Sequence, residues 1–381
     1  MTIAATHKTP DNTTETPLFV AFELSEKTWK LGFSTGPGQK PRERNVTARD
    51  PERVLDEIAQ AKRRFGLPES VPVVSCYEAG REVFWLHRFL LAHDITNHVV
   101  DSCSIEVSRR RRRAKSDGLD VRKLLSMLMR YHHGERQVWR VVNVPSVEAE
   151  DQRHLHRDLE TLKQERASTT TRIKGLLSSQ GLRVTSLTNL PEQLDALRLW
   201  DGSPLPPGLR QRVLSVYAHH QFLSEQIAQV EAARRARLHD SSDASIEKVR
   251  QLMLLKGIGI NGSWLLVMEF FGWRAFKNRR EVGGLAGLTP TPYQSGDSAR
   301  EQGISKSGNR RVRWMITELA WSWLRFQPDS ALSAWFRERF GDGGKRLRRI
   351  GIVAMARKLL ITLWRFLETG VLPEGAALKV G

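Results

Sequence analysis

The sequence contains only two cysteines, Cys76 and Cys103, among its 381 residues, and neither lies in a Cys-X-X-Cys pair or at the spacing of Cys and His metal ligands. This scarcity argues against a disulfide framework and a structural zinc site, and it favours a reducing, cytoplasmic environment. The sequence also lacks an apolar run of the roughly 20 residues that a membrane-spanning helix needs. Residues 1–17 form a polar leader without the apolar centre of a signal peptide. We therefore expect a protein that is neither secreted nor embedded in a membrane.

Acidic residues are scarce relative to basic ones, because 42 Asp and Glu stand against 60 Lys and Arg, which gives a formal net charge of +18. A surplus of this size favours a polyanionic partner, and nucleic acid is the leading one. The chain nevertheless differs from a disordered basic tail, since 40% of its residues are hydrophobic and eleven are tryptophan. Its length suffices for two or three folded domains.

The first part of the chain, residues 18–145, alternates strand and helix patterns. Short apolar segments predict strands, and the first two are close enough to form a hairpin across a short turn. Segments with apolar residues at helical spacing separate the later strands. The expected strands are 18–25, 28–34, 72–77 and 97–100, and the expected helices are 50–65, 84–92 and 117–131. This alternation predicts an α/β layer architecture.

The rest of the chain has a helical pattern. Apolar residues recur at helical spacing over 147–177 and over 209–238, and the proline-bearing segment 184–208 separates the two runs. They predict two long helices that return on each other, either as a dimerisation arm or as an ordinary helical subdomain. The sequence thus predicts an α/β plus α protein. Its expected parts are a leader at 1–17, an α/β domain at 18–145, a coiled-coil-like helical region at 146–245 and a mostly helical C-terminal domain at 246–381.

Four carboxylates lie where strands end or a helix begins. Glu23 and Glu78 follow predicted strands, and Asp117 and Asp120 lie three residues apart at the start of a predicted helix. If the two strands are parallel, their ends meet at one edge of the sheet, while the two aspartates share a helix face. Clustered carboxylates are tolerated when a hard cation such as Mg²⁺, or Mn²⁺ in its place, neutralises them, and two such ions would stabilise both oxygens of a phosphoryl displacement. The alternative is two surface charges and a helix N-cap.

A block of six cations in seven positions lies directly before the aspartate pair. Like charges at this density repel one another unless solvent or a polyanion screens them. Phosphate backbone is the natural counterpart, and a solvated basic face is the alternative. The six candidates for binding nucleic acid are Arg109, Arg110, Arg111, Arg112, Arg113 and Lys115.

The segment Gly257-Ile258-Gly259, followed by an apolar run over 264–271, has the form of a helix-hairpin-helix turn. Gly257 and Gly259 would let the backbone approach a phosphate, and the amides at the next helix N-terminus would receive it. Such a turn binds nucleic acid without reading its sequence. A tight turn between packed helices explains the two glycines equally well.

Ser295 lies directly before a glycine in the segment 287–296, which is rich in glycine and proline. A serine held in a rigid turn beside cations is suited to attack a phosphorus atom and hold the product as a phosphoserine. Cations nearby would cradle the phosphate and stabilise the transition-state charge. Ser-Gly pairs are also common turn chemistry, which is the alternative. The cations in question are Arg300, Lys306, Arg310, Arg311 and Arg313.

Two blocks of motifs occur in order along the chain. The first comprises Tyr77-Glu78-Ala79-Gly80 through Phe84-Trp85-Leu86-His87-Arg88, then Val99-Val100-Asp101-Ser102 and Ala114-Lys115-Ser116-Asp117-Gly118-Leu119-Asp120. The second comprises Gly257-Ile258-Gly259, Gly287-Leu288-Thr289-Pro290, Gln294-Ser295-Gly296 and Gly303-Ile304-Ser305-Lys306-Ser307-Gly308-Asn309. In these motifs the chain resembles the DEDD transposases of bacterial insertion sequences, the insertion sequence 110 family. The likeness covers almost everything from residue 18 onward.

The resemblance implies a RuvC-like domain of the ribonuclease H fold, a helical middle and a C-terminal transposase domain. It implies that Glu23, Glu78, Asp117 and Asp120 form an acidic quartet that binds the metal, and that Ser295 is the nucleophile. The family usually has aspartate at the first acidic position, where this chain has a glutamate, one methylene longer. The resemblance further implies a bacterial recombinase, associated with the nucleoid when bound to DNA, that a structured RNA guides to donor and target DNA.

These residues together suggest DNA strand exchange through a covalent 5′-phosphoserine intermediate. Because the acidic residues and the serine lie in different predicted domains, we expect a composite site in a dimer or tetramer. Two other classes stay open. One is a metal-dependent nuclease that resolves branched DNA by water attack. The other is a non-catalytic nucleic-acid-binding protein, a domesticated transposase weakened at Glu23.

Overall fold

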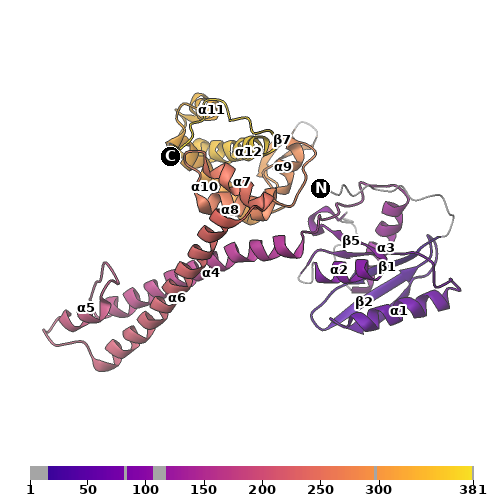
Figure 1. Ribbon diagram of the computed structural model, residues 1–381, viewed down its shortest axis with the longest axis horizontal. Helices are drawn as coiled ribbons and strands as arrows, with labels where there is room; N and C mark the ends of the chain where they lie inside the picture. Colours follow the sequence, from indigo (N-terminus) through magenta and orange to yellow (C-terminus); the bar gives the residue numbers. More distant parts are fainter. Residues whose placement is uncertain (1–15, 81–83, 106–116, 296–297, 380–381) are drawn as a thin grey trace. The chain divides into compact units, whose positions relative to one another are not determined.

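The computed structural model describes residues 16–80, 84–105, 117–295 and 298–379, with the backbone alone at 103, 117–119 and 292–302. The chain divides into two compact units, Met1–Val144 and Pro145–Gly381. The first unit contains a mixed sheet with helices on its two faces, and the second is helical apart from one hairpin (Figure 1). The predicted class, α/β plus α, is confirmed at this level.

The five-stranded sheet of the first unit has the order β3-β2-β1-β4-β5 in the part of the chain described. Strand β1 pairs with β2 in antiparallel fashion and with β4 in parallel, and β5 continues the sheet parallel to β4. Leu18–Phe22 of β1 is buried on both faces because helices cover each side, which is why its sequence is continuously apolar. The strands are β1 Leu18–Glu23, β2 Thr28–Ser34, β3 Arg42–Thr47, β4 Val73–Glu78 and β5 Ile95–Val100.

Alternate side chains of the central strand enter two separate apolar cores. Leu18, Val20 and Phe22 pack into the core that α1 (Pro51–Arg64) and α2 (Trp85–Ala92) close. Phe19 and Ala21 point to the opposite face, which α3 (Asp117–His132) covers. The period-two alternation of a strand thus divides one apolar run between two layers of helices.

Every strand and helix that we expected in the first unit is present within a few residues of its predicted bounds. Strand β3 was missed. Its sequence, Arg-Glu-Arg-Asn-Val-Thr, contains one buried apolar residue, Val46. An edge strand needs little apolar surface and is protected by charged side chains, so its pattern resembles that of a loop.

The second unit begins with two long helices, α4 (Val147–Ser178) and α6 (Pro207–Asp240), which lie side by side in opposite directions (Figure 1). Lys163 of α4 pairs with Glu231 of α6 at 2.7 Å, and Gln152 donates to Asp243, just beyond the end of α6, at 2.9 Å. The predicted helix pair is therefore confirmed. The intervening segment, expected to be irregular, contains a short helix, α5 (Leu190–Ala196). Its Leu190 and Leu194 are buried in the apolar cluster at that end of the pair.

The remaining helices of the second unit pack around one large core that includes Trp264, Phe270 and Trp323. A two-stranded antiparallel hairpin, β6 (Pro290–Ser295) and β7 (Ser298–Ile304), lies in sequence between α9 (Arg279–Leu285) and α10 (Arg310–Phe326). Along the described stretches of the chain, none of the helices combines the length and apolar character needed to cross a membrane. The helices are α7 Ala244–Met253, α8 Ile260–Leu266, the π-helix η3 Val267–Phe271, α9 Arg279–Leu285, α10 Arg310–Phe326, α11 Ala331–Phe340 and α12 Lys345–Thr369.

Candidate active site

Two of the predicted carboxylates are neighbours at one edge of the sheet. Strands β1 and β4 are parallel and adjacent, with Phe22 opposite Tyr77, and Glu23 and Glu78 are the last residues of these strands. Parallel neighbours lie about 4.8 Å apart. Phe22 and Tyr77, the residues directly before the two carboxylates, point to the face that α1 and α2 cover. Successive side chains of a strand point to opposite faces, so Glu23 and Glu78 point to the face that α3 covers.

Helix α3 begins at that same edge. Its Val121 packs against Gly32, where a Cβ atom would lie 2.3 Å from the valine Cγ1. Gly32 is paired with Ala21, two residues before the end of β1. The last turn of α3 lies at the other end of β1, since the ring of His132 contacts the ring of Phe19 at 5.2 Å between centroids. The helix therefore runs antiparallel to β1, and its first turn lies toward the carboxyl end of that strand.

This direction brings the start of α3, with Asp117 and Asp120, to the edge that holds Glu23 and Glu78. Glu78 is exposed, and Glu23 and Asp120 are half-buried; the side chain of Asp117 lies outside the description. No group of three or more His, Cys, Asp or Glu side chains arranged to hold a metal ion occurs among the residues described. A pair of neighbouring carboxylates is nevertheless a donor set that suits Mg²⁺, which takes one or two carboxylates and completes its shell with waters and phosphate oxygens.

A further acidic residue at this edge, Asp101, belongs to a motif quoted above but was not among the predicted site residues. Asp101 follows β5, the next parallel strand, and its amide donates to the carbonyl of Arg140 at 2.9 Å. The hydroxyl of Ser102 donates to the carbonyl of Ala79 at 3.0 Å, which joins the segment after β4 to the segment after β5. The detectable signal was the position of Asp101 after a predicted strand. The basic block, Arg109 to Arg113 and Lys115, lies outside the described residues.

Ser295 ends strand β6 and pairs with Ser298 of β7, so it lies at the tip of the hairpin. The position of its backbone is described, and its side chain is not. The two residues between the strands, 296 and 297, also lie outside the description.

The segments before β6 and after β7 contact each other at two glycines, Gly287 and Gly308, whose backbones lie very close to neighbouring backbone. Gly287 has φ +69°, and a Cβ atom added there would lie 2.1 Å from the carbonyl oxygen of Ser307. Gly308 has φ +103°, and a Cβ atom added there would lie 2.1 Å from the carbonyl oxygen of Leu285. The amide of Lys306 donates to the Gly287 carbonyl at 3.1 Å. These contacts require glycine at both positions. The Gly-Leu-Thr-Pro and Ser-Gly-Asn motifs are therefore two segments that pack closely against each other, and we call this contact between Gly287 and Gly308 the glycine clasp.

The cations expected to hold a phosphate fall into two groups. Lys306 and Arg310 are exposed. Arg311 is paired with Glu160 of α4, and Arg313 donates to the carbonyl of Ala286 at 3.1 Å. Burial lowers the pKa of both of the latter guanidinium groups, with a neighbouring arginine as the second cause. Their internal partners show that they also hold the start of α10 in position. The side chain of Arg300 lies outside the description.

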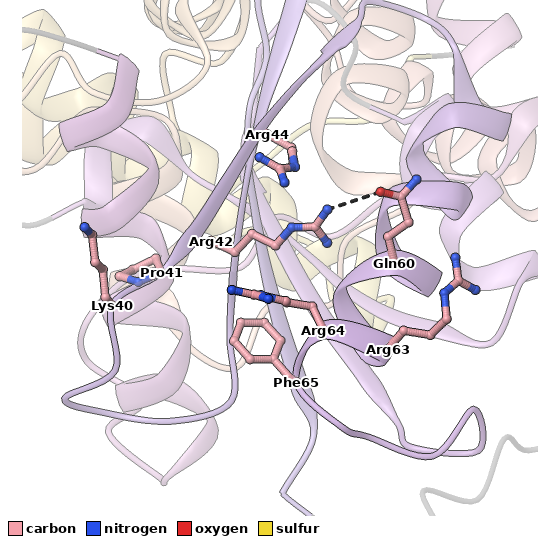
Figure 2. A pocket seen from close by; sticks show the side chains of 8 residues that line it. All are labelled: Lys40, Pro41, Arg42, Arg44, Gln60, Arg63, Arg64 and Phe65. Atoms are coloured by element: carbon pink, nitrogen blue, oxygen red, sulfur yellow. Dashed lines mark hydrogen bonds between the residues drawn. The ribbon is translucent and has the colours of Figure 1, made fainter.

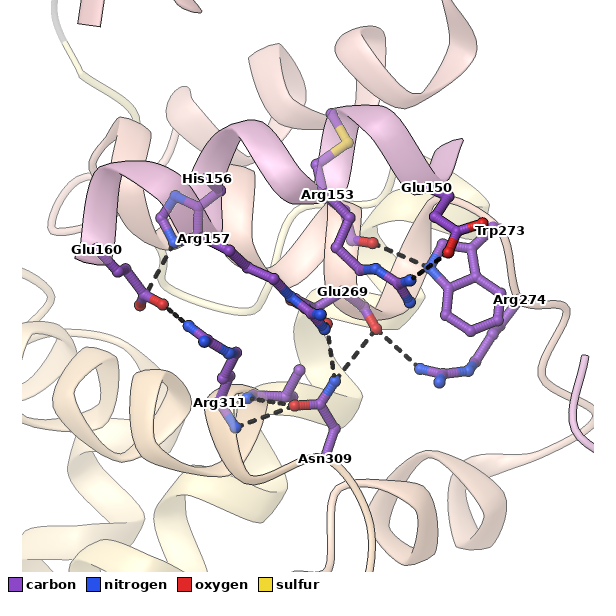
Figure 3. A network of polar contacts seen from close by, with 12 residues as sticks. Glu150, Arg153, His156, Arg157, Glu160, Glu269, Trp273, Arg274, Asn309 and Arg311 are labelled. Atoms are coloured by element: carbon purple, nitrogen blue, oxygen red, sulfur yellow. Dashed lines mark hydrogen bonds and ion pairs between the residues drawn. The ribbon is translucent and has the colours of Figure 1, made fainter. Parts of the chain in front are cut away.

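A buried carboxylate, Glu269 of the π-helix, organises a polar network with residues of α4 and the start of α10 (Figure 3). Arg157 of α4 donates to it through two nitrogens, and the side-chain amide of Asn309 donates to Glu269 Oε2 at 3.2 Å. Asn309 also caps α10, because its Oδ1 accepts from the amides of Arg311 and Val312. One residue thus connects the helix that follows the hairpin to a buried ion pair.

The predicted helix-hairpin-helix turn is packed inside the second unit. Gly257 has φ +82°, and a Cβ there would lie 3.1 Å from Cβ of Phe326. The Gly257 carbonyl accepts from the Ser322 hydroxyl at 2.7 Å, and the Ile258 carbonyl accepts from Lys379 at 2.9 Å. Gly259 is exposed and precedes α8. Close packing between helices accounts for Gly257 without a phosphate.

Comparisons with known proteins give the class. The family model described as the transposase IS116/IS110/IS902 family matches residues 249–334, which include the hairpin and its clasp. A Sinorhizobium fredii protein named provisionally as the transposase y4rJ is 41% identical over 379 residues, which cover 95% of this chain and 94% of that protein. The transposase for insertion sequence element IS1328 of Yersinia enterocolitica is 26% identical over 219 residues, or 55% of this chain and 60% of that protein. The chain belongs to the IS116/IS110/IS902 family of transposases.

Proposed function

We propose that this transposase exchanges DNA strands through a covalent 5′-phosphoserine at Ser295, assisted by Mg²⁺ or Mn²⁺ at the carboxylate edge of the sheet. The main support is the parallel pairing of β1 and β4, which makes Glu23 and Glu78 neighbours on the face where α3 begins. Acidic residues that converge in this way are typical of metal-assisted phosphoryl transfer. The order β3-β2-β1-β4-β5 with β2 antiparallel agrees with a RuvC-like ribonuclease H fold for the first unit.

In the forward step, Ser295 Oγ attacks the phosphorus of a DNA strand as its proton departs. The new Oγ–P bond forms while the bond from phosphorus to the 3′ oxygen breaks, and that oxygen leaves as a 3′-hydroxyl after taking up a proton. In the reverse step, a 3′-hydroxyl of the exchanged strand attacks the phosphoserine and releases the serine hydroxyl. One phosphodiester is replaced by another, so no external energy is consumed.

The residues that would hold the metal ion are Glu23 and Glu78, with Asp117 and Asp120 from the first turn of α3. A bound divalent cation would offset charge on the phosphate oxygens. Lys306 and Arg310 are exposed at the foot of the hairpin and would bind the phosphate of the scissile strand. The glycine clasp and Asn309 would keep the hairpin in a fixed orientation.

We also propose that a structured RNA guides this protein to donor and target DNA, and that it works as a dimer or tetramer. The surplus of basic residues supports binding to more than one nucleic-acid strand. The carboxylates and Ser295 lie in different compact units, which supports a site assembled from two subunits. Sequencing of RNA that copurifies with the protein tests guidance, because a discrete structured species is expected and random cellular RNA would contradict it.

The decisive experiment is a denaturing gel of end-labelled DNA incubated with the full chain, its copurified RNA and Mg²⁺. We expect a slowly migrating, protease-sensitive adduct. Ser295→Ala should abolish this adduct, whereas Ser298→Ala, the matched change across the hairpin, should retain it. An adduct that persists in Ser295→Ala would refute the nucleophile. Hydrolysed ends without adduct would instead indicate a nuclease, and unchanged DNA would indicate a binding protein.

A further inference from the structure

A basic hollow of about 630 Å³ lies in the first unit, beside β3 and α1 (Figure 2). Five of its lining residues are cations, none is an acid, and Phe65 contributes an aromatic wall. It is separate from the carboxylate edge, because it lies between the edge strand β3 and the last turn of α1. The lining residues are Lys40, Pro41, Arg42, Arg44, Gln60, Arg63, Arg64 and Phe65.

The hollow follows from how β3 and α1 meet. Arg42 and Arg44 alternate with the buried Val46, so all three point to the face that α1 covers. The last turn of α1 carries Arg63 and Arg64, where the helix dipole favours positive charge. Two independent sources of cations are therefore directed to one place.

One buried carboxylate supports this cluster without neutralising it. Glu57, with 4% of its side chain exposed, contacts Arg42 at 3.0 Å and Arg44 at 3.7 Å. It also accepts from Arg53 at 3.1 Å, so its single charge is shared among three guanidinium groups. The remaining cations of the hollow keep a positive surplus.

Arg42 is the least exposed of the cations that line the hollow. Its side chain is only 13% exposed, and its Nη1 is buried without a hydrogen-bond partner, although Nη2 donates to Gln60 at 3.3 Å. The pKa of Arg42 is lowered by burial first and then by Arg44 and Arg64, while Glu57 raises it. Because Nη1 has almost no accessible surface, an anion in the hollow would instead meet the exposed guanidinium groups of Arg44, Arg63 and Arg64.

Protection of an edge strand is the simpler explanation for charges on β3. That purpose is served by charges in open solvent. It does not explain why Arg63 and Arg64, from a different element, converge on the same hollow as Arg42 and Arg44.

We propose that this hollow binds the phosphate backbone of a nucleic-acid strand, with the arginines donating to phosphate oxygens and Phe65 contacting a sugar or base. Arginine suits this task because its planar fork pairs with phosphate in a bidentate way. An aromatic face beside cations is a common arrangement for single strands. The inference takes from the proposed function only the class of ligand, and it involves neither Ser295 nor a metal ion.

The first test measures binding of labelled single-stranded DNA, RNA of the same sequence and duplex DNA to the full chain in EDTA, where strand exchange does not occur. Arg64→Glu, an exposed position in the hollow, should weaken binding by about fivefold or more and lower the dependence of log Kd on log salt by about one. Lys27→Glu makes the same charge change at an exposed position away from the hollow and should stay within about twofold of wild type.

A loss confined to RNA would identify the bound strand as RNA, and a loss confined to DNA would identify it as DNA; either supports the site. Equal weakening by Arg64→Glu and Lys27→Glu would overturn it, because general electrostatics would then suffice. If both variants weaken binding equally but still form the phosphoserine adduct, the hollow is refuted and the proposed function is not.

The second test needs no substitution. Lys40 lines the hollow and Lys27 does not, and both are exposed. Acylation of the two lysines, followed by mass spectrometry, should show that bound oligonucleotide slows modification of Lys40 several-fold and leaves Lys27 unchanged. Protection of neither lysine, or of both equally, would refute the site.

Discussion

Arg157 and Glu269 form a bidentate ion pair, in which Arg157 Nε donates to Glu269 Oε1 at 2.7 Å and Arg157 Nη2 donates to Glu269 Oε2 at 3.0 Å. The pair joins the long helix α4 to the π-helix η3, and 112 residues of chain separate its members. Glu269 is 1% exposed, so its charge needs this partner. Since Asn309 donates to the same carboxylate, the pair also supports the start of α10 and hence the base of the hairpin.

We predict that Glu269→Gln lowers the free energy of unfolding by about 2 kcal/mol, because it removes the charge that Arg157 needs while keeping the side-chain shape. Glu231→Gln is the matched control. It breaks the pair with Lys163, whose side chains are each 37% exposed, and should cost about 0.5 kcal/mol or less. Chemical denaturation of the full chain, followed by a signal from the second unit, measures the free energy of unfolding of both variants. Equal losses would contradict a structural role for Glu269.

The clasp under the hairpin predicts a sharp contrast between two glycines. Gly308→Ala should destabilise the protein by about 3 kcal/mol or more and reduce the yield of covalent adduct, because the new Cβ would meet the Leu285 carbonyl at 2.1 Å. Gly303→Ala, also at positive φ (+83°) but with no atom of the described chain within 4 Å, should cost only about 1 kcal/mol. Thermal unfolding and the adduct gel report the two effects. Similar behaviour of both variants would show that the close approach is unimportant.

The carboxylate edge predicts dependence on a divalent cation. Glu78→Gln should reduce Mg²⁺-dependent adduct formation by about a hundredfold or more, since one charged ligand is lost. Glu69→Gln, in an exposed loop, is the matched control and should be neutral. EDTA should stop the reaction and added Mg²⁺ or Mn²⁺ should restore it. Full activity of Glu78→Gln would contradict the proposed role of this residue as a metal ligand.

The same assay addresses Glu23, which the resemblance assigns to a position where the family usually has aspartate. Glu23→Asp shortens the side chain by one methylene and should retain activity at a level equal to or above that of the original chain. A titration with Mg²⁺ would show whether the half-maximal concentration changes. An inactive Glu23→Asp that still folds would mean that the rest of this site has adapted to the longer side chain.

A pH effect is expected from His156, which is 3% exposed and has no hydrogen-bond partner at either ring nitrogen. Burial, followed by the charges of Arg234 and Arg311, lowers its pKa from 6.5 to about 3. The folded protein therefore keeps His156 neutral while the unfolded chain takes up a proton below pH 6.5, so stability falls as the pH falls. The loss should reach about 2 kcal/mol by about pH 5.

Comparison of the original chain with His156→Gln isolates this contribution, because glutamine is polar and does not titrate in this range. The variant should lose less stability between about pH 7 and pH 5 in denaturation experiments. The contact of His156 Nε2 with Glu160 at 3.6 Å is not an ion pair at neutral pH, since the ring is uncharged. Identical pH profiles would show that His156 protonates freely in the folded state.

Local sequence patterns predicted much of the secondary structure. The alternation of strands and helices up to residue 144 and the helices over 147–178 and 207–240 follow from apolar periodicity, because burial of one face is a property of neighbouring residues. Among the missed elements, β3 and α5 contain too few apolar residues to produce such a pattern and depend on their neighbours for packing. Strands β6 and β7 were also missed, since a rigid turn was expected around Ser295. The π-helix at Val267–Phe271 likewise has no local signature.

The sequence by itself determined the surplus of positive charge, the α/β and helical character of the two units, and the residue types suited to phosphoryl transfer, because these depend on composition and local order. Tertiary structure alone decided which residues meet: the parallel neighbours Glu23 and Glu78, the partners Arg157 and Glu269, and the arginines of β3 and α1 around Arg42. The physical reason is that hydrogen bonds, ion pairs and hollows join side chains distant in the chain, and strand pairing and helix packing set those distances.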